Sequence, residues 1–475
     1  MTFGPPESQD VVIIGATGDL ARRKLLPALY NLYLQGLLPE EGRIIGFARG
    51  ASDDGKFRGL AARAIGEFSR TPLDDVRWPR FASRLHYVSG EQGFAGVKAC
   101  CPAPYRLIYL AIPPSAFPDT IRGLGTAGLA EGARLVVEKP FGRDVESARM
   151  LGEAIHAVFR ESQVFRIDHY LGKETVQNIF VFRFANSAFE RVWNRDAIDH
   201  FQFTVAESVG IEGRGSFYEE TGALRDILQN HVFQVLALLT MEPPSSISSE
   251  PVRDEKIKLF RAMRPLTVED TVRGQYTRRQ VDGATVPGYR EEPGVAPDSQ
   301  TETFAAVRLH IDNWRWAGVP FFLRTGKRLP RHATEVVVSF REAPVPMFAG
   351  TGVEQLPPNR LTIVIQPQEQ IRFEFMAKVP GPQLDVEPVT MEFSYDTAFK
   401  TVPAEAYERL LHDAMNGDAT LFARADSVER AWEVVEPILS AMPPVAPYPA
   451  GTWGPPGADA LIAPRTWIQP GTVHA

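Results

Sequence analysis

The stretch Arg166–Glu174 concentrates side chains that could bind and oxidise a phosphorylated, hydroxylated ligand. It offers a carboxylate, an imidazole, a phenol and an ammonium group, from Asp168, His169, Tyr170 and Lys173. Gly172 lets the backbone approach a ligand, and a helix predicted from Thr175 would present free N–H groups to an anion. The alternative is a polar loop whose charges are merely solvated.

Strands and helices alternate before this stretch. The predicted strands are 10–14, 43–48, 105–112, 134–137 and 164–167. The predicted helices are 20–34, kinked at Pro27, and 144–160, while 51–104 is expected to form helices and loops. Strands alternating with helices predict a Rossmann-like, doubly wound and mostly parallel sheet, whose ligands bind at the carboxyl ends of the strands.

The first predicted strand runs into a glycine turn and then a helix, the arrangement that binds the pyrophosphate of a dinucleotide. The candidate cofactor contacts in this turn are Gly15, Ala16, Thr17, Gly18, Asp19 and Leu20. The second strand ends at Arg49, where NAD-binding proteins place an acid and where an arginine suits the 2′-phosphate of NADP. Lys24 adds positive charge nearby, although Arg49 could also be an ordinary surface residue.

Lys139 is expected at the carboxyl end of another strand. Pro140 follows it and disfavours a helical conformation for the lysine. Its side chain should therefore lie at the ligand edge of the sheet, within reach of both cofactor and substrate.

The pattern changes after about residue 180, where strands predominate and indicate an α+β domain with a mainly antiparallel sheet. We therefore expect two domains, 1–175 and 176–475. One long helix, 221–239, carries His231 in an apolar stripe beside Asp226. Residues 281–300 should form an excursion loop, and the tail from Pro443 should lack regular structure.

Removing a hydride from a sugar carbon requires a base for the hydroxyl proton, and a neutral histidine suits that task. A carboxylate on the second ring nitrogen would fix the tautomer and stabilise the imidazolium. His231 and Asp168 are the candidates, although a histidine in an apolar stripe could also be a core residue. An NADP site beside such a cluster points to oxidation of a phosphorylated sugar.

The composition sets outer limits on function. With 51 Lys+Arg against 58 Asp+Glu, the chain has a net charge of −7, which argues against nucleic acid as its main partner. There is no apolar run long enough to span a membrane and no signal peptide, so a cytoplasmic location is expected. The two cysteines are adjacent, which fits a reducing compartment without disulfides. No metal is expected.

Six motifs in order resemble the glucose-6-phosphate dehydrogenase family, from about residue 9 to the tail. They are Gly15–Leu20 with Arg23-Lys24-Leu25, Glu138–Gly142, Arg166–Glu174, Glu212–Gly215, Arg225–His231, and Gly318-Val319-Pro320 to Leu323–Lys327. The resemblance implies that glucose 6-phosphate is oxidised with NADP at the entry of the pentose phosphate pathway. It also implies a homodimer or homotetramer assembled through the large sheet.

The resemblance further implies roles for individual residues. His231 matches the general base and Asp168 its carboxylate partner. The residues that match the family's contacts to the sugar ring and its phosphate are Lys139, His169, Tyr170, Lys173, Glu207, Asp226, Lys327 and Gln366. Lys24 and Arg49 match cofactor contacts.

Two departures from the family pattern concern charge. His332 stands where many relatives carry a second basic residue for the phosphate, so either His332 or its neighbour Arg331 would supply that contact. The segment 333–336 lacks the basic residues that bind a second, structural NADP in some relatives. The competing interpretations are a sugar oxidoreductase of the glucose–fructose oxidoreductase type and a non-catalytic NADP sensor.

Overall fold

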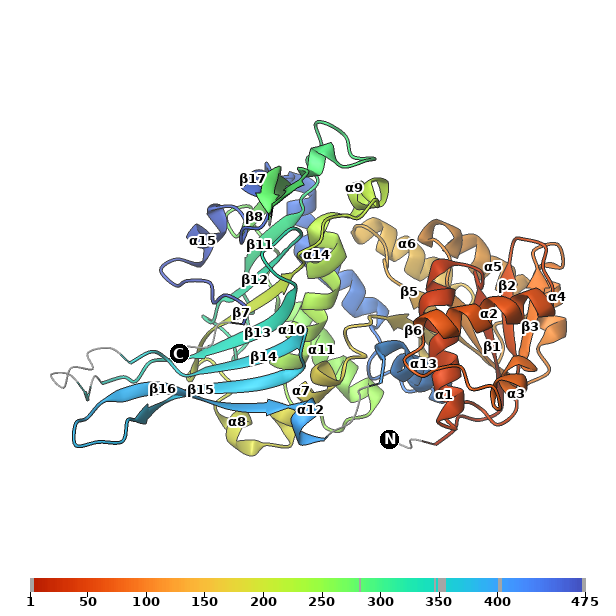
Figure 1. Cartoon of the computed structure of the whole chain (residues 1–475), viewed down its shortest axis with the longest axis horizontal. Helices are drawn as coiled ribbons and strands as arrows, with labels where there is room; N and C mark the ends of the chain where they lie inside the picture. Colours follow the sequence, from red (N-terminus) through yellow and green to blue (C-terminus); the bar gives the residue numbers. More distant parts are fainter. Residues whose placement is uncertain (1–3, 282, 346, 349–355, 400–403, 472–475) are drawn as a thin grey trace. The chain divides into compact units, whose positions relative to one another are not determined.

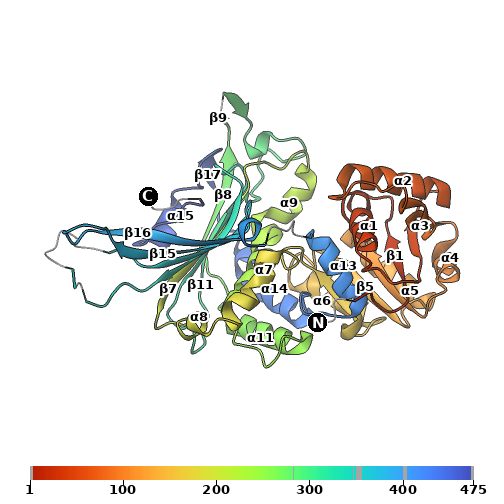
Figure 2. The same ribbon diagram turned by 60° about the horizontal axis from the view of Figure 1, so that its bottom comes forward.

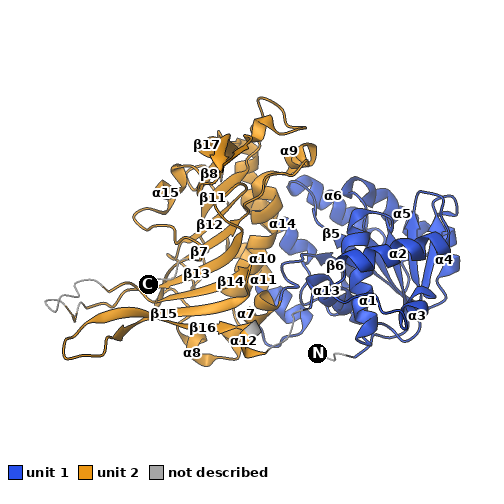
Figure 3. Cartoon of the chain, in the orientation of Figure 1, with its two compact units in different colours: residues 1–173, 244–255, 404–429 blue, residues 174–243, 256–403, 430–475 orange. Residues whose placement is uncertain are grey.

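The computed structural model describes residues 4–281, 283–345, 347–348, 356–399 and 404–471. The chain forms two compact units, which Figure 3 distinguishes by colour. The first unit consists of 1–173, 244–255 and 404–429, and the second of 174–243, 256–403 and 430–475. Two late segments of the chain therefore complete the unit that contains the N-terminal region.

The first unit is built on a parallel sheet (Figure 1). Its strands are β1 (Gln9–Ile14), β2 (Ile44–Ala48), β3 (Leu85–Ser89), β4 (Tyr105–Leu110), β5 (Ala133–Glu138) and β6 (Val164–Ile167). They lie in the order β3-β2-β1-β4-β5-β6, and all neighbouring pairs are parallel. This order confirms the predicted doubly wound sheet, with its switch point between β1 and β4. The expectation of helices and loops alone in 51–104 was wrong, because β3 forms one edge of the sheet.

Helices cover both faces of this sheet. They are η1 (Ala21–Leu25, a π-helix), α1 (Leu26–Leu34), α2 (Asp54–Phe68), α3 (Trp78–Ala82), α4 (Gly93–Cys100), η2 (Pro114–Ala116), α5 (Phe117–Thr126), α6 (Val145–His156), η3 (Glu161–Gln163) and α13 (Ala406–Asn416). Consecutive β2 residues separate the faces: a side chain at Gly46 would meet Phe57 of α2, while Phe47 packs against Phe94 of α4. Pro27 lies in the first turn of α1, directly after the π-helical turn, so the expected irregularity precedes the proline.

Helix α13 joins this unit through a buried carboxylate. Glu408 accepts a hydrogen bond from Asn31 Nδ2 of α1 at 2.9 Å. It also accepts two hydrogen bonds from the Arg70 guanidinium, at 2.7 and 2.8 Å. Glu408 is only 1% exposed, and a buried carboxylate is costly unless it is paired and hydrogen-bonded, so these contacts tie α13 to the unit. Polar contacts thus attach α13, which lies more than 300 positions later in the sequence, to the unit with the parallel sheet.

The second unit is built on a larger sheet (Figures 1 and 2). Its strands are β7 (Ile198–Ala206), β8 (Thr271–Thr277), β11 (Phe304–Leu309), β12 (Phe321–Gly326), β13 (Ala333–Phe340), β14 (Arg360–Gln366), β15 (Gln370–Lys378), β16 (Val386–Ser394) and β17 (Ala446–Pro449). Their order is β16-β15-β14-β13-β7-β12-β11-β8-β17. Neighbours are antiparallel except β7–β12 and β8–β17, which confirms the mainly antiparallel sheet.

The remaining elements of the second unit include a small hairpin and several helices. They are α7 (Glu174–Phe184), α8 (Ser187–Arg191), α9 (Gly215–Ala223), η4 (Leu224–Val232, a π-helix), α10 (Phe233–Thr240), β9 (Arg279–Val281), β10 (Ala284–Val286), η5 (Tyr289–Glu291), α12 (Tyr395–Ala398) and α15 (Gly457–Ile462). Helices α11 (Ser249–Ala262) and α14 (Ala425–Ala441) have residues in both units. The tail was wrongly expected to be irregular, because β17 pairs with β8 and α15 packs beside it.

Alternate residues of β12 face opposite sides of the large sheet. Phe321 packs against Trp316, whereas Phe322 and Arg324 lie against Trp467 of the tail. Figures 1 and 2 show α7 and α10 on one side of the sheet and α15 on the other. The tail therefore covers an aromatic face of the sheet and buries Trp467. Among the described helices, none combines the length and the apolar character needed to cross a membrane.

Candidate active site

The glycine turn lies at the carboxyl end of β1, beside the switch point of the parallel sheet. Gly18 N–H donates to Gly15 O at 2.9 Å and closes the turn. The helix that follows begins with the π-helical turn η1, in which Arg23 pairs with Asp19 at 3.2 Å. Lys24 Nζ pairs with Glu405 at 2.9 Å, so the expected cofactor lysine already has an acidic neighbour from the late segment. The turn and the helix start fit a dinucleotide pyrophosphate.

Arg49 follows β2 directly and is exposed, as the sequence predicted. Its backbone lies beside Gly90, where a side chain would come within 3.1 Å of Arg49 Cα. Two neighbouring strands, β2 and β3, therefore bring Arg49 to the ligand edge. An exposed guanidinium at this place fits the 2′-phosphate of NADP.

Strand β5 ends in a half-buried acid, Glu138, which belongs to one of the sequence motifs but was not assigned a role of its own. Glu138 Oε1 accepts hydrogen bonds from Tyr407 Oη at 3.0 Å and from Tyr109 Oη. Burial raises the pKa of Glu138, although the two phenols and the charge of Lys139 act in the opposite direction. Lys139 follows at once, so the cofactor lysine is attached to a strand end fixed by two tyrosines.

The segment after β6 is held by a series of tight turns. Tyr170 N–H donates to Asp168 Oδ1 at 2.9 Å, and Leu171 N–H to Asp168 O at 3.0 Å. Asp168 is 3% exposed. The Lys173 ammonium lies 4.5 Å from the centre of the Tyr170 ring, and the His169 ring lies 5.1 Å from it. The first unit thus brings together all four groups expected in this stretch.

Gly172 allows a close approach within the first unit. A side chain there would come within 2.8 Å of Ala406 O and 2.9 Å of Ala406 Cβ. The glycine therefore admits the start of α13, and close access of a ligand to its backbone stays a prediction. The same approach places the following residue, Tyr407, where its phenol reaches Glu138.

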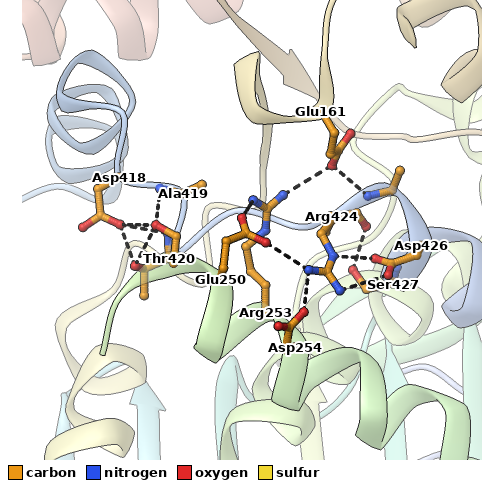
Figure 4. Close-up of polar contacts among 12 residues, drawn as sticks. Glu161, Glu250, Arg253, Asp254, Asp418, Ala419, Thr420, Arg424, Asp426 and Ser427 are labelled. Atoms are coloured by element: carbon orange, nitrogen blue, oxygen red, sulfur yellow. Dashed lines mark hydrogen bonds and ion pairs between the residues drawn. The ribbon is translucent and has the colours of Figure 1, made fainter. Parts of the chain in front are cut away.

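Ion pairs surround Glu161, which lies just before β6, and Figure 4 shows its contact with Arg253 and the nearby pairs of Arg424. Glu161 Oε1 accepts from Arg166 at 2.7 Å, from Arg253 at 3.3 Å and from the Ala425 N–H at 3.0 Å. Burial acts to raise the pKa of Glu161, but Arg166 and the other donors lower it below its usual value. Arg424 pairs with Asp254 at 2.7 Å and with Asp426 at 2.9 Å. Segments from three parts of the chain thereby support the strand that carries Asp168.

In the second unit, the parallel pairing of β7 and β12 brings an acid and a lysine together. Glu207 follows β7, Lys327 follows β12, and Lys327 Nζ lies 2.5 Å from Glu207 Oε2. Lys327 is 3% exposed, and its ammonium lies 5.1 Å from the centre of the Tyr218 ring. Burial raises the pKa of Tyr218 well above its usual value, and negative charge on Asp226 adds to the effect. Three expected substrate groups therefore surround Tyr218, which sequence reasoning missed.

The other expected substrate groups lie at the same edge of the large sheet. Gln366 ends β14, and its Oε1 accepts from Thr334 Oγ1 at 3.4 Å across the strand pair. Arg331 and His332 are both exposed in the turn that precedes β13. Arg331 Nη1 donates to Pro470 O at 2.8 Å. A guanidinium has five N–H donors, so Arg331 could also donate to a phosphate.

His231 lies in η4, and it is 1% exposed. The single helix predicted for 221–239 was wrong in its detail, because the chain breaks at Gly222, continues as a π-helix and becomes α-helical only at Phe233. Asn230 Oδ1 accepts the His231 N–H at 2.6 Å. Because π-helices are rare, the apolar stripe of 221–239 was interpreted with the 3.6-residue period of an α-helix.

The fold and these groups define a class of protein. A parallel sheet with a glycine turn at its switch point binds a dinucleotide, and the accompanying bases and acids are those of an oxidoreductase acting on a polar, anionic substrate. Residues 12–178 match the family model "Glucose-6-phosphate dehydrogenase, NAD binding domain", and residues 180–468 match "Glucose-6-phosphate dehydrogenase, C-terminal domain". The chain belongs to the glucose-6-phosphate dehydrogenase family.

Individual relatives agree over the full length. A curated protein named glucose-6-phosphate 1-dehydrogenase from Mycolicibacterium smegmatis is 47% identical, with 97% of each chain covered. A crystal structure of glucose-6-phosphate 1-dehydrogenase from Mycobacterium avium superposes with a TM-score of 0.87 at 41% identity, covering 98% of this chain and 100% of the other. A glucose-6-phosphate dehydrogenase in complex with glucose 6-phosphate gives a TM-score of 0.90 at 36% identity, covering 99% and 100%.

Membership of this family confirms the expected resemblance and enzyme class. The chain is an oxidoreductase of glucose 6-phosphate, and its N-terminal part is a domain that binds a nicotinamide dinucleotide. The match across both parts of the chain decides against the glucose–fructose oxidoreductase type and against a non-catalytic sensor.

Proposed function

We propose that the chain oxidises D-glucose 6-phosphate at C1 to 6-phospho-D-glucono-1,5-lactone, the oxidative entry step of the pentose phosphate pathway. The full-length match to the family, in both its domains, carries this proposal. In this proposal residues 1–175 hold the cofactor, and residues 176–475 contribute substrate contacts and oligomerisation. A cytoplasmic homodimer or homotetramer assembled through the large sheet completes the proposal.

His231 is the general base in this proposal, and Asp168 is its carboxylate partner. The imidazole accepts the proton of the C1 hydroxyl, since that hydroxyl is too weak an acid to ionise alone at neutral pH. Asp168 holds the tautomer that leaves one ring nitrogen free to accept, and it stabilises the imidazolium that forms. The support is the type of residue, the family motif and the burial of both side chains.

NADP, when bound, supplies the nicotinamide carbon that accepts the hydride. Its pyrophosphate would lie on the turn Gly15–Leu20, with Lys24, Arg49 and Lys139 as the cationic contacts. Arg49 is the group for the 2′-phosphate, because it stands alone and exposed beyond β2. Lys139 would serve both cofactor and sugar, being next to Glu138 at the end of β5.

The residues proposed to contact the substrate are Lys139, His169, Tyr170, Lys173, Glu207, Asp226, Lys327, Gln366 and either Arg331 or His332. We favour Arg331 for the phosphate, because an arginine is always charged and can donate more than one hydrogen bond at a time.

A spectrophotometric assay of NADPH formation tests the proposal. Glucose 6-phosphate should be a far better substrate than free glucose, because binding of the remote phosphate helps to orient C1. His231→Asn should lower kcat by at least about 10²-fold with little change in KM. Equal efficiency with both sugars would refute the substrate, and normal turnover of His231→Asn would refute the base.

A further inference from the structure

The helix that carries His231 begins at a backbone break supported by a buried acid. Gly222 has φ +67°, and a side chain there would come within 2.5 Å of Glu302 Oε1. Immediately after this break, Leu224 N–H donates to Glu302 Oε1 at 3.1 Å and Ala223 N–H donates to Glu302 O at 3.0 Å. The first N–H groups of a helix have no partner within it, so Glu302 acts as the N-terminal cap of η4.

Arg273 of β8 fixes the orientation of this cap. Its Nη2 and Nε donate to Glu302 Oε2 at 2.8 and 3.1 Å, and both side chains are almost fully buried. Arg273 also donates to Gln300 O at 2.8 Å and to Pro443 O. One carboxylate oxygen thus faces the arginine and the other faces the helix, which leaves Glu302 a single orientation.

The π-helix continues directly as α10, and three side chains cap the C-terminal end of α10. Arg183 Nη1 donates to Leu238 O at 3.0 Å and to Met241 O at 2.9 Å. Trp193 Nε1 donates to Leu239 O at 2.6 Å, and Trp316 Nε1 donates to Thr240 O at 2.7 Å. The terminal carbonyl groups, which lack partners within a helix, are therefore satisfied by rigid, buried donors. The run 224–240 is held at both ends.

The π-helical geometry of η4 places Asp226 and His231, two expected site residues, on the same side of the helix. Hydrogen bonds in a π-helix join residues five apart, so Asp226 and His231 lie one turn apart. In an α-helix, residues five apart point about 140° away from each other. Since π-helices usually last only a single turn, the longer η4 requires support from outside the helix.

We propose that Glu302, oriented by Arg273, is a positioning residue for the dehydrogenase reaction: it fixes the start of the π-helix and so places Asp226 and His231 together at the substrate edge. The inference rests on the proposed role of His231. Glu302 touches neither substrate nor cofactor in this proposal and acts only through the helix. The two residues form a unit, because the cap without the arginine would be a buried, unpaired carboxylate.

Two double variants separate positioning from stability. Arg273→Met/Glu302→Gln removes both charges but keeps an oxygen that can accept the Leu224 N–H. Arg273→Met/Glu302→Leu removes both charges and also the acceptor, with side chains of similar size. Replacing a buried ion pair by neutral groups of similar volume costs little stability, so both proteins should fold. Thermal unfolding confirms this before any kinetic comparison.

The kinetic result should differ between the two double variants. The glutamine variant should keep most of the wild-type kcat. The leucine variant should lose about 10- to 100-fold in kcat with KM for glucose 6-phosphate nearly unchanged, because small displacements of a reacting group have effects of this size. The acidic limb of its kcat/KM profile against pH should also shift, since His231 would sit in altered surroundings.

Asp270→Asn is the matched control. Asp270 pairs with Arg308 and so links the same two strands, β8 and β11, without touching η4. This variant should change stability while leaving kcat and the pH profile as in the wild type. A leucine double variant with wild-type kcat and pH profile would overturn the inference. Loss of activity in His231→Asn alongside that result would leave the proposed function standing, whereas an active His231→Asn would refute the proposed function itself.

Discussion

In the first unit Asp168 follows directly from a strand of the parallel sheet, whereas in the second unit His231 lies within a π-helix. Pairing with β5 fixes the edge strand β6, and ion pairs of the partly exposed Glu161 with the buried Arg166 and Arg253 reinforce it. The π-helix is not part of a sheet: Glu302 caps its start, while Arg183 and Trp193 cap the end of α10, which continues it to Thr240. Placement by a sheet is distributed over many backbone hydrogen bonds, while placement by caps depends on a few side chains.

The largest effect should come from the C-terminal cap in the second unit. Arg183→Met removes a fully buried cation that caps Leu238 and Met241 and pairs with Glu190, and it should lower the free energy of unfolding by about 3–5 kcal/mol. Urea unfolding measures this. Arg424→Met is the matched change in the first unit. It should cost less than about 1 kcal/mol, because the acids around Arg424 are largely exposed. Equal losses would contradict the contrast.

Arg49→Ala should affect only the ligand held by the first unit. A charge-assisted contact is worth roughly 1.5–3 kcal/mol, so affinity for NADP should fall on the order of 10- to 150-fold. Affinity for NAD and KM for glucose 6-phosphate should change little. Kinetics with each cofactor test this, with Arg22→Ala in η1, after the glycine turn, as a control. An unchanged NADP/NAD ratio would show that Arg49 is an ordinary surface residue.

Two acids of the first unit should respond to pH in opposite directions. The pKa of Glu161 is lowered on folding, so its contribution to stability is present at neutral pH and is lost as pH falls through the folded pKa, below about 4.3. The pKa of Glu138 is raised by burial, so stability is lost as pH rises through its folded pKa.

The variants Glu161→Gln and Glu138→Gln test these signs by urea unfolding between pH 4 and 8. Glu161→Gln should cost about 1–2 kcal/mol at pH 7 and progressively less toward pH 4. Glu138→Gln keeps an acceptor for Tyr109 and Tyr407. Its free energy of unfolding, relative to that of the wild type, should be higher at pH 8 than at pH 4. If the free energy of unfolding of the two variants changed with pH in the same way, the opposite pKa shifts of Glu161 and Glu138 would be contradicted.

The smallest effect should be at the phosphate contact in the second unit. Arg331→Ala should raise KM for glucose 6-phosphate by about five- to tenfold, and His332→Ala by less than about twofold. If His332 carries the contact instead, KM should climb between about pH 6.5 and 8.5, and His332→Lys should flatten that climb. A pH-independent KM with a harmless Arg331→Ala would leave Lys173 and its neighbours as the phosphate contact.

Features set by neighbouring residues were predictable, and those set by distant ones were not. The strand, the glycine turn and Arg49 lie within one short run, so local pattern identified them. Nothing near Glu138 indicates that Tyr407 donates to it, and nothing near Leu224 indicates that Glu302 caps it. Lys327 pairs with Glu207 because β7 and β12 are neighbours in the sheet, and the sequence does not show that these two distant strands pair. Motifs therefore found candidate residues, while their supporting partners required the fold.

The membership of 404–429 in the first unit has a consequence for the order in which the protein is made. During synthesis the six parallel strands leave the ribosome first, but Asn31 and Arg70 lack Glu408 until α13 has followed. The N-terminal layer is thus among the last parts to acquire its full set of contacts. A fragment ending near residue 175 would expose the surface of α1 that α13 covers, and it should bind nucleotide poorly and aggregate.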